Sequence, residues 1–154
     1  MGNRSENLIL AQKLIGQFAG TIIQESKIYE TSAWGATNQE SFYNQVLVLE
    51  TELNASDLMS KFLEIEAYMG RTRIKKWEPR IMDIDILFFN DEVIQTPDLS
   101  IPHPLSQERR FVLVPLSELI PDFVHPVFNK TMNQLLEECS DAGNVTEVVS
   151  ADEF

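Results

Sequence analysis

Within residues 80–89, apolar and acidic residues alternate from Met82 to Ile86, and this pattern constrains the fold more than any other feature of the sequence. Side chains two residues apart on a β-strand project from the same face, roughly 6–7 Å apart. One parity is apolar and can be buried in a core: Met82, Ile84, Ile86 and Phe88. The other parity starts with Asp83 and Asp85. The pattern therefore predicts a strand that presents two carboxylates on one face.

These two carboxylates repel each other unless a cation lies between them. Their oxygen atoms suit Mg²⁺, particularly when phosphates complete its coordination. A solvent-facing side of an antiparallel sheet would carry the same residues without any ligand. However, Leu87 and Phe89 continue the parity of the aspartates and are apolar. That face is therefore expected to be covered further along, with a metal site at its open end.

Basic residues are concentrated in two short segments, although the net charge of the chain is −12. The two segments hold seven of the twelve Lys and Arg residues: Arg71, Arg73, Lys75, Lys76, Arg80, Arg109 and Arg110. The negative net charge argues against general nucleic-acid binding. The local concentration of bases favours a small anion such as a phosphate, although two solvated loop surfaces would give the same pattern.

Length and composition indicate one soluble globular domain over residues 1–154, of which 44% are hydrophobic. No apolar run is long enough for a membrane span, and the N-terminus has no signal-peptide pattern. Cys139 is the single cysteine, so no internal disulfide can form. We therefore expect a cytoplasmic protein without a membrane partner, in which Cys139 is a structural residue.

The order of the expected elements indicates an α+β sandwich with an antiparallel sheet. Helical spacing predicts a helix over 3–18, with Leu8, Ala11, Ile15 and Phe18 on its buried face and Gly20 as its stop. Strands are expected at 21–29 and 42–52. A second helix, capped by Asn54 or Ser56 and ended by Gly70, carries an apolar stripe formed by Leu58, Phe62, Ile65 and Met69.

The remaining elements follow the aspartate segment. A short strand is expected at 92–95, and a helix is expected to begin after Pro115. Residues 131–134 resemble a capping box that opens a helix ending near Cys139. Residues 144–149 form a candidate last strand.

Other candidate ligand-binding residues lie before and after the aspartate segment in the sequence. His103 lies between two prolines and could donate to a phosphate oxygen, or it could be a surface histidine. Trp77 and Phe111 adjoin bases, and each could anchor a loop or stack on a flat ring. Glu66 lies one step off the apolar stripe and could accept a hydrogen bond from a ligand hydroxyl. His125 has no basic neighbours and is interpreted as structural.

Four segments together resemble the 6-hydroxymethyl-7,8-dihydropterin pyrophosphokinase family, which transfers pyrophosphate from ATP to a pterin in folate synthesis. They are Gly-Arg-x-Arg at 70–73, Trp-x-Pro-Arg-x-x-Asp-Ile-Asp-Ile-Leu at 77–87, Ile-Pro-His-Pro at 101–104 and Arg-x-Phe-Val-Leu-x-Pro-Leu at 109–116. A weaker resemblance covers residues 2–126. It implies a ferredoxin-like antiparallel sheet with helices packed on it, plus an extra hairpin and a C-terminal helix.

The resemblance also implies roles for individual residues. Asp83 and Asp85 would hold two Mg²⁺ ions on ATP, and Arg71 and Arg80 would act with them in catalysis. The ATP-binding positions would be Glu66, Arg73, His103 and Arg109. The pterin-binding positions would be Thr31, Phe42, Asn44, Trp77 and Phe111. The partners would be ATP and hydroxymethyldihydropterin, without nucleic acid, in a monomer or weak homodimer.

Three expectations remain beside this resemblance. The sequence begins inside the family's opening Gly-Ser-Asn-Leu-Gly-Asp-Arg region, so the family's first strand has no counterpart; residues 145–149 or a neighbouring chain could take its place. A Mg²⁺-dependent nucleotide-sugar transferase, which also uses Asp-x-Asp, is the alternative enzyme class. A binding protein that has lost activity is the alternative without catalysis.

Overall fold

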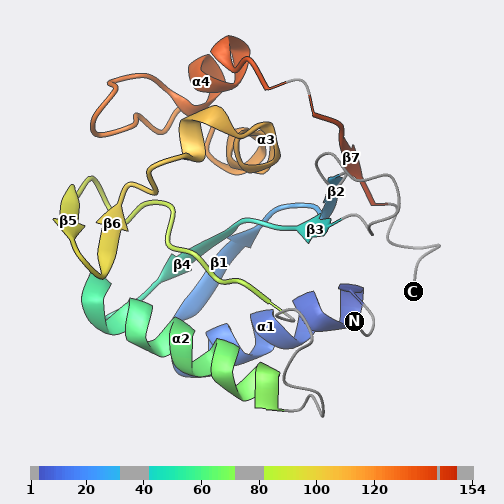
Figure 1. The fold of residues 1–154 in the computed structure, drawn as a ribbon, viewed down its shortest axis with the longest axis vertical. Helices are drawn as coiled ribbons and strands as arrows, with labels where there is room; N and C mark the ends of the chain where they lie inside the picture. Colours follow the sequence, from blue (N-terminus) through green and yellow to red (C-terminus); the bar gives the residue numbers. More distant parts are fainter. Residues whose placement is uncertain (1–3, 32–41, 72–81, 142, 149–154) are drawn as a thin grey trace.

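The computed structural model describes residues 4–31, 42–71, 82–141 and 143–148, except for the side chain of Arg71. In Figure 1, two helices, α1 and α2, lie on one side of a β-hairpin formed by β1 and β4. Two further helices, α3 and α4, lie on its other side. Each pair of helices has its own core of buried side chains. The α+β class predicted from the sequence is confirmed.

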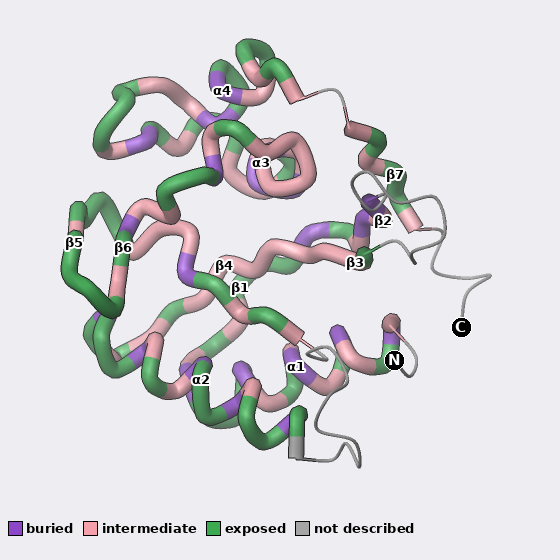
Figure 2. Tube along the Cα trace, viewed as in Figure 1, coloured by how far each residue is buried: buried purple, intermediate pink, exposed green. Residues whose placement is uncertain are grey.

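Helices α1 (Arg4–Phe18) and α2 (Ala55–Arg71) form the first layer. The whole predicted stripe of α2 is buried, and the inner faces of both helices are buried in Figure 2. Asn54 is the cap of α2, since its Oδ1 accepts a hydrogen bond of 2.8 Å from the N–H of Asp57. Two predictions were wrong. Phe18 is 53% exposed because Ala19 takes the buried position, and α2 continues through Gly70 to Arg71.

Strands β1 (Thr21–Glu25) and β4 (Leu47–Glu50) pair antiparallel. The chain then bends, and β2 (Tyr29–Thr31) pairs antiparallel with β3 (Phe42–Asn44). Each long strand expected from the sequence is therefore two short ones. The bend is stabilised by two hydrogen bonds between Ser26 and Val46. The main-chain N–H of Ser26 donates to the carbonyl of Val46 at 2.9 Å, and the main-chain N–H of Val46 donates to Oγ of Ser26 at 3.0 Å.

Gly20 joins α1 to β1 at a point where the backbone of β4 approaches closely. A Cβ atom at this position would lie 2.3 Å from the carbonyl oxygen of Glu50. Only glycine fits there without a shift of the main chain. The predicted stop of the first helix is thus confirmed, and its reason is the packing of the turn on a neighbouring strand.

Strand β7 (Val145–Glu147) is the last of the described strands and lies within the predicted 144–149; it pairs antiparallel with β2. The order in this sheet is β3–β2–β7. The hypothesis that residues 145–149 replace the family's first strand is therefore wrong for 145–147, because these residues extend the sheet at β2. Among the described strands, β4 pairs with β1 alone.

The aspartate segment, residues 82–89, is not a regular strand, which corrects the first prediction from the sequence. Figure 1 shows it as an irregular segment that runs between the two pairs of helices. A strand requires a partner about 4.8 Å away with which to exchange main-chain hydrogen bonds. A cavity lies between this segment and β4, so the described residues provide no such partner.

The hairpin and the second helical layer follow. Strands β5 (Ile94–Thr96) and β6 (Leu99–Ile101) form the expected extra hairpin, displaced from the predicted 92–95. A 3₁₀ turn, η1 (Ser106–Glu108), leads into α3 (Arg110–Leu119), which begins well before Pro115. Helix α4 (Met132–Glu138) opens with the predicted capping box between Thr131 and Gln134.

Candidate active site

The aspartate segment presents its carboxylates to solvent, as the alternation predicted. Ile86 is 6% exposed, and Met82 and Ile84 pack on the core between α1 and α2. Asp83 and Asp85 are exposed. The alternation ends after Ile86, because Leu87 and Phe88 both pack on the core of α3 and α4. The prediction that Phe88 shares a core with Ile86 was therefore wrong.

Glu66 fixes the main chain between the two aspartates. Its Oε2 accepts a hydrogen bond of 2.6 Å from the N–H of Ile84. Glu66 lies on α2 directly after the buried Ile65, so its half-buried side chain emerges at the edge of the core. The sequence suggested a ligand hydroxyl as its partner, whereas the structure shows a main-chain donor in the aspartate segment.

His103 lies beside the same segment. Its main-chain N–H donates to the carbonyl of Leu87 at 2.9 Å, and Leu87 lies two residues after Asp85. Its Nδ1 accepts from the N–H of Leu105 at 3.4 Å. A neutral imidazole whose Nδ1 accepts carries its proton on Nε2, which can then donate to an anion. The Ile101–Pro102 peptide bond that precedes His103 is cis.

Arg109 and Phe111 lie together at the start of α3. The guanidinium carbon of Arg109 is 5.8 Å from the centre of the Phe111 ring, which is within cation–π range. Arg109 is the N-cap residue of the helix, and both side chains are half-buried. A positive charge and an aromatic face, which are two of the predicted ligand-binding features, therefore occupy one end of one helix.

Three predicted pterin-binding residues lie on β2 and β3. Asn44 Nδ2 donates to Thr31 Oγ1 at 3.1 Å, and Thr31 pairs with Phe42 in the strand register. Thr31 is buried, whereas Phe42 is 58% exposed. The structure thus brings these three residues together as one polar and aromatic group.

Four predicted residues cannot be placed in the site. Arg73, Trp77 and Arg80 lie outside the described residues. Arg71 is the last residue of α2, but its side chain is not described.

A cavity of about 570 Å³ separates the aspartate segment from β4. Its lining comes from α1, α2, β4, residues 82–90 and the C-terminal part of α3. Most of these side chains are apolar, and Asp83 and Asp85 contribute to the wall. The cavity lies beside the carboxylates, at a place where the described residues put no strand between the segment and β4.

The described residues fit Mg²⁺ held jointly with a ligand better than a metal site made by protein alone. Within the described ranges, no group of three or more His, Cys, Asp or Glu side chains could enclose a metal ion. Mg²⁺ commonly binds through one or two carboxylates when substrate phosphates supply its other ligands, and Asp83 and Asp85 are exposed. The donor set therefore suits a magnesium–phosphate complex.

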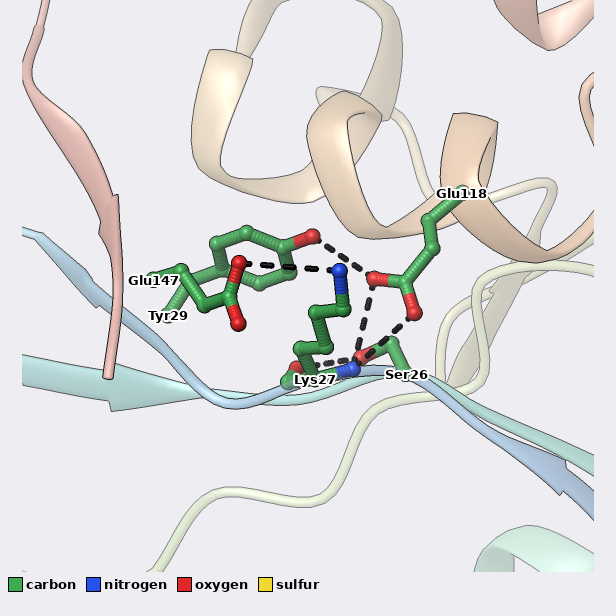
Figure 3. A network of polar contacts seen from close by, with 5 residues as sticks. All are labelled: Ser26, Lys27, Tyr29, Glu118 and Glu147. Carbon is green, nitrogen blue, oxygen red and sulfur yellow. Dashed lines mark hydrogen bonds and ion pairs between the residues drawn. The ribbon is translucent and has the colours of Figure 1, made fainter. Parts of the chain in front are cut away.

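Sequence reasoning missed a polar network that ties α3 to the sheet (Figure 3). Glu118 Oε1 accepts from the Tyr29 hydroxyl at 2.6 Å, and both Glu118 oxygens lie 3.2 Å from the main-chain N of Lys27. The side chain of Lys27 pairs with Glu147 at 3.6 Å. Burial, the hydrogen bond to Glu118 and the charges of Glu118 and Glu147 all raise the pKa of Tyr29. No spacing in the sequence signalled this network, because its members lie far apart along the chain.

Comparison with known proteins identifies the family of the chain. A family model described as "7,8-dihydro-6-hydroxymethylpterin-pyrophosphokinase (HPPK)" matches residues 1–121. A protein of Aquifex aeolicus named 2-amino-4-hydroxy-6-hydroxymethyldihydropteridine pyrophosphokinase is 38% identical over 138 residues, which cover 90% of this chain and 86% of that protein.

Two larger proteins also match. Folic acid synthesis protein FOL1 of Dictyostelium discoideum is 36% identical over 148 residues, which cover 96% of this chain but 22% of that protein. A crystal structure of Plasmodium falciparum HPPK-DHPS has a TM-score of 0.71 at 20% identity, covering 90% of this chain and 42% of that one. This chain therefore spans less than half the length of these two proteins, and the solved structure supports the fold alone.

Proposed function

The chain belongs to the 7,8-dihydro-6-hydroxymethylpterin-pyrophosphokinase family, and from this premise we propose that it transfers pyrophosphate from Mg²⁺-bound ATP to 6-hydroxymethyl-7,8-dihydropterin in folate synthesis. The observation that carries the proposal is the pair of exposed carboxylates, Asp83 and Asp85, on a main chain that Glu66 holds between them. The family implies this chemistry, and the described side chains supply groups suited to it.

Asp83 and Asp85 would hold the magnesium–phosphate complex. When bound, Mg²⁺ neutralises phosphate charge and favours displacement at phosphorus. Glu66 has a supporting role in this proposal. By accepting from the N–H of Ile84, it fixes the direction in which the carboxylates on either side project. Ligand carboxylates that are held by their surroundings bind a metal better than mobile ones do.

The cationic groups would neutralise the triphosphate. His103 can donate through Nε2, and Arg109 offers a guanidinium at the start of α3. Arg71, Arg73 and Arg80 are assigned to the same task from the sequence, with Arg71 and Arg80 acting in the transition state. Fixed positive groups of this kind stabilise the charge that develops on transferred and leaving oxygens.

The second substrate would be recognised by aromatic faces and amide groups. A pterin is flat, with hydrogen-bonding groups along its rim. Phe111 and Trp77 would stack on its two faces, and Phe42 would contribute a further apolar edge. Asn44, oriented by its hydrogen bond to Thr31, would contact the rim.

The reaction needs positioning and charge neutralisation rather than a protein nucleophile. The hydroxymethyl oxygen of the pterin attacks the β-phosphorus of ATP and forms a new O–P bond. The bond from that phosphorus to the oxygen bridging it to the α-phosphate breaks, the proton of the hydroxyl is released, and AMP leaves. The side chains hold the two substrates in line and exclude competing orientations.

The protein's setting is also part of the proposal. In the described part of the chain, none of the helices combines the length and apolar character needed to cross a bilayer. We retain the expectation of a cytoplasmic monomer or weak homodimer. We also expect no nucleic-acid partner, because the acidic net charge of −12 disfavours binding to polyanions.

The test is AMP formation from ATP in the presence of Mg²⁺, with and without hydroxymethyldihydropterin. The proposal expects AMP only when the pterin is present, together with a pterin diphosphate product in equal amount. ATP consumption that is independent of the pterin would contradict the proposal, as would the release of ADP in place of AMP. A nucleotide-sugar substrate turned over in place of ATP would favour the transferase alternative.

A further inference from the structure

Helix α3 lacks a cap from its own N-terminal residue. Arg109, the N-cap, makes no side-chain hydrogen bond to the first turn. The first N–H groups of a helix have no partner within the helix and require one from elsewhere. The residue that provides it comes from a distant part of the chain.

That residue is Asp141, in the segment between α4 and β7. Its Oδ2 accepts a hydrogen bond of 3.0 Å from the N–H of Arg110, 31 residues earlier. Its Oδ1 accepts one of 2.9 Å from the N–H of Gly143. The two main-chain bonds lower the pKa of Asp141, with a further contribution from the charge of Arg110. A negative charge at this place also interacts favourably with the helix dipole.

The capped end is the end that carries the site. Arg110 lies between Arg109 and Phe111, which are assigned here to the triphosphate and the pterin. The opposite end of α3 is held separately, since Glu118 accepts from the hydroxyl of Tyr29. Loss of the Asp141 carboxylate would therefore release only the end of the helix with the two ligand-binding side chains.

We propose that Asp141 is a positioning residue for both substrates: it caps α3 from the C-terminal segment and so sets the location of Arg109 and Phe111. This role rests on the proposed function. It extends the site beyond residue 121, where the match to the family model ends. In this role Asp141 acts through the main chain of Arg110 and not by contact with a substrate.

The test compares Asp141→Ala with Thr131→Ala. Thr131 caps α4 through its own hydrogen bond to Gln134, so its loss should reduce stability in a similar way without moving α3. We expect Asp141→Ala to raise KM for both ATP and the pterin roughly 10-fold at a temperature where both variants are folded. Asp141→Asn keeps one acceptor oxygen and should give an intermediate effect. Thr131→Ala should keep the KM values of the parent protein.

Two further measurements separate this inference from the proposed function. Isothermal calorimetry of Mg-ATP binding should show weaker binding for Asp141→Ala, and the difference should vanish when Arg109 is also replaced by Ala. Amide hydrogen exchange should become faster in the first turn of α3 in Asp141→Ala alone. Unchanged KM values and unchanged exchange in that variant would overturn the inference. An inactive parent protein with faster exchange in Asp141→Ala would instead count against the proposed function.

Discussion

The carboxylate of Glu66 accepts a hydrogen bond of 2.6 Å from the main-chain N–H of Ile84. This bond joins the last turns of α2 to the residue between Asp83 and Asp85. In a segment without strand pairing, this hydrogen bond satisfies the main-chain N–H of Ile84 and restricts the position of the main chain, as a neighbouring strand would otherwise do. The exposed carboxylates can then project from a defined position although none of the described strands pairs with their segment.

Replacing Glu66 by Ala should weaken metal and ATP binding. The N–H of Ile84 would lose its acceptor, and the aspartates would lose a fixed main chain, which typically costs about 10–100-fold in metal affinity or activity. Titration with Mn²⁺ in the presence of ATP would measure the affinity. Glu66→Gln is the matched control, since its amide oxygen can still accept from Ile84 and should preserve most of the binding. Equal losses in both variants would indicate that Glu66 contacts the ligand directly.

Removal of either aspartate should abolish turnover without unfolding the protein. Both side chains are exposed, so Asp83→Ala and Asp85→Ala create no cavity in the core. AMP formation measures turnover, and circular dichroism checks the fold. Asp98→Ala removes an exposed carboxylate from the tip of the β5–β6 hairpin and should leave activity unchanged. Activity near that of the parent in either site variant would disprove the assignment.

Tyr29→Phe should destabilise the protein while leaving the active site intact. The variant loses the hydroxyl that donates to Glu118, and a hydrogen bond to a charged group contributes about 1.5–3 kcal/mol to the free energy of unfolding. Urea unfolding would measure the loss. Tyr68→Phe is a suitable control, because Tyr68 is 51% exposed on α2. An equal loss in both variants would show that the contact with Glu118 adds nothing to stability.

Stability should fall as the pH drops below about 6.5 because of His125. This side chain is 2% exposed, and its Nδ1 accepts from the N–H groups of Val127 and Phe128. Burial lowers its pKa from the ordinary value of 6.5. The unfolded chain therefore takes up a proton before the folded protein does, so folding stability is complete above the unfolded pKa and declines towards the folded one.

The measurement is urea unfolding at about pH 7.5 and about pH 5.5, on either side of the ordinary histidine pKa. The parent protein should lose stability between the two. His125→Phe should be less stable overall, because the two N–H groups lose their acceptor, but its stability should vary less over the same range. An unchanged pH dependence in that variant would assign the effect to other groups.

Several local features of the fold could be predicted from the sequence, since they depend on neighbours along the chain. The stripe of α2 is buried as its spacing predicted, and the capping box of Thr131 and Gln134 forms as expected. The alternation of residues 82–86 correctly placed the aspartates on the exposed face. Family motifs then indicated the chemistry. The roles of Arg73, Trp77 and Arg80 remain predictions, as these residues lie outside the described ranges.

By itself the sequence determined which faces are buried, where most helices begin and which residues carry the proposed chemistry, because periodicity and capping are local. Only the tertiary structure decided that the aspartate segment is not a strand, since a ladder requires a neighbour that no local pattern supplies. It also decided the partners of Glu66, Tyr29 and Asp141. The partners in these hydrogen bonds are 18, 89 and 31 residues apart in the sequence, so only the packing of the folded chain brings them into contact.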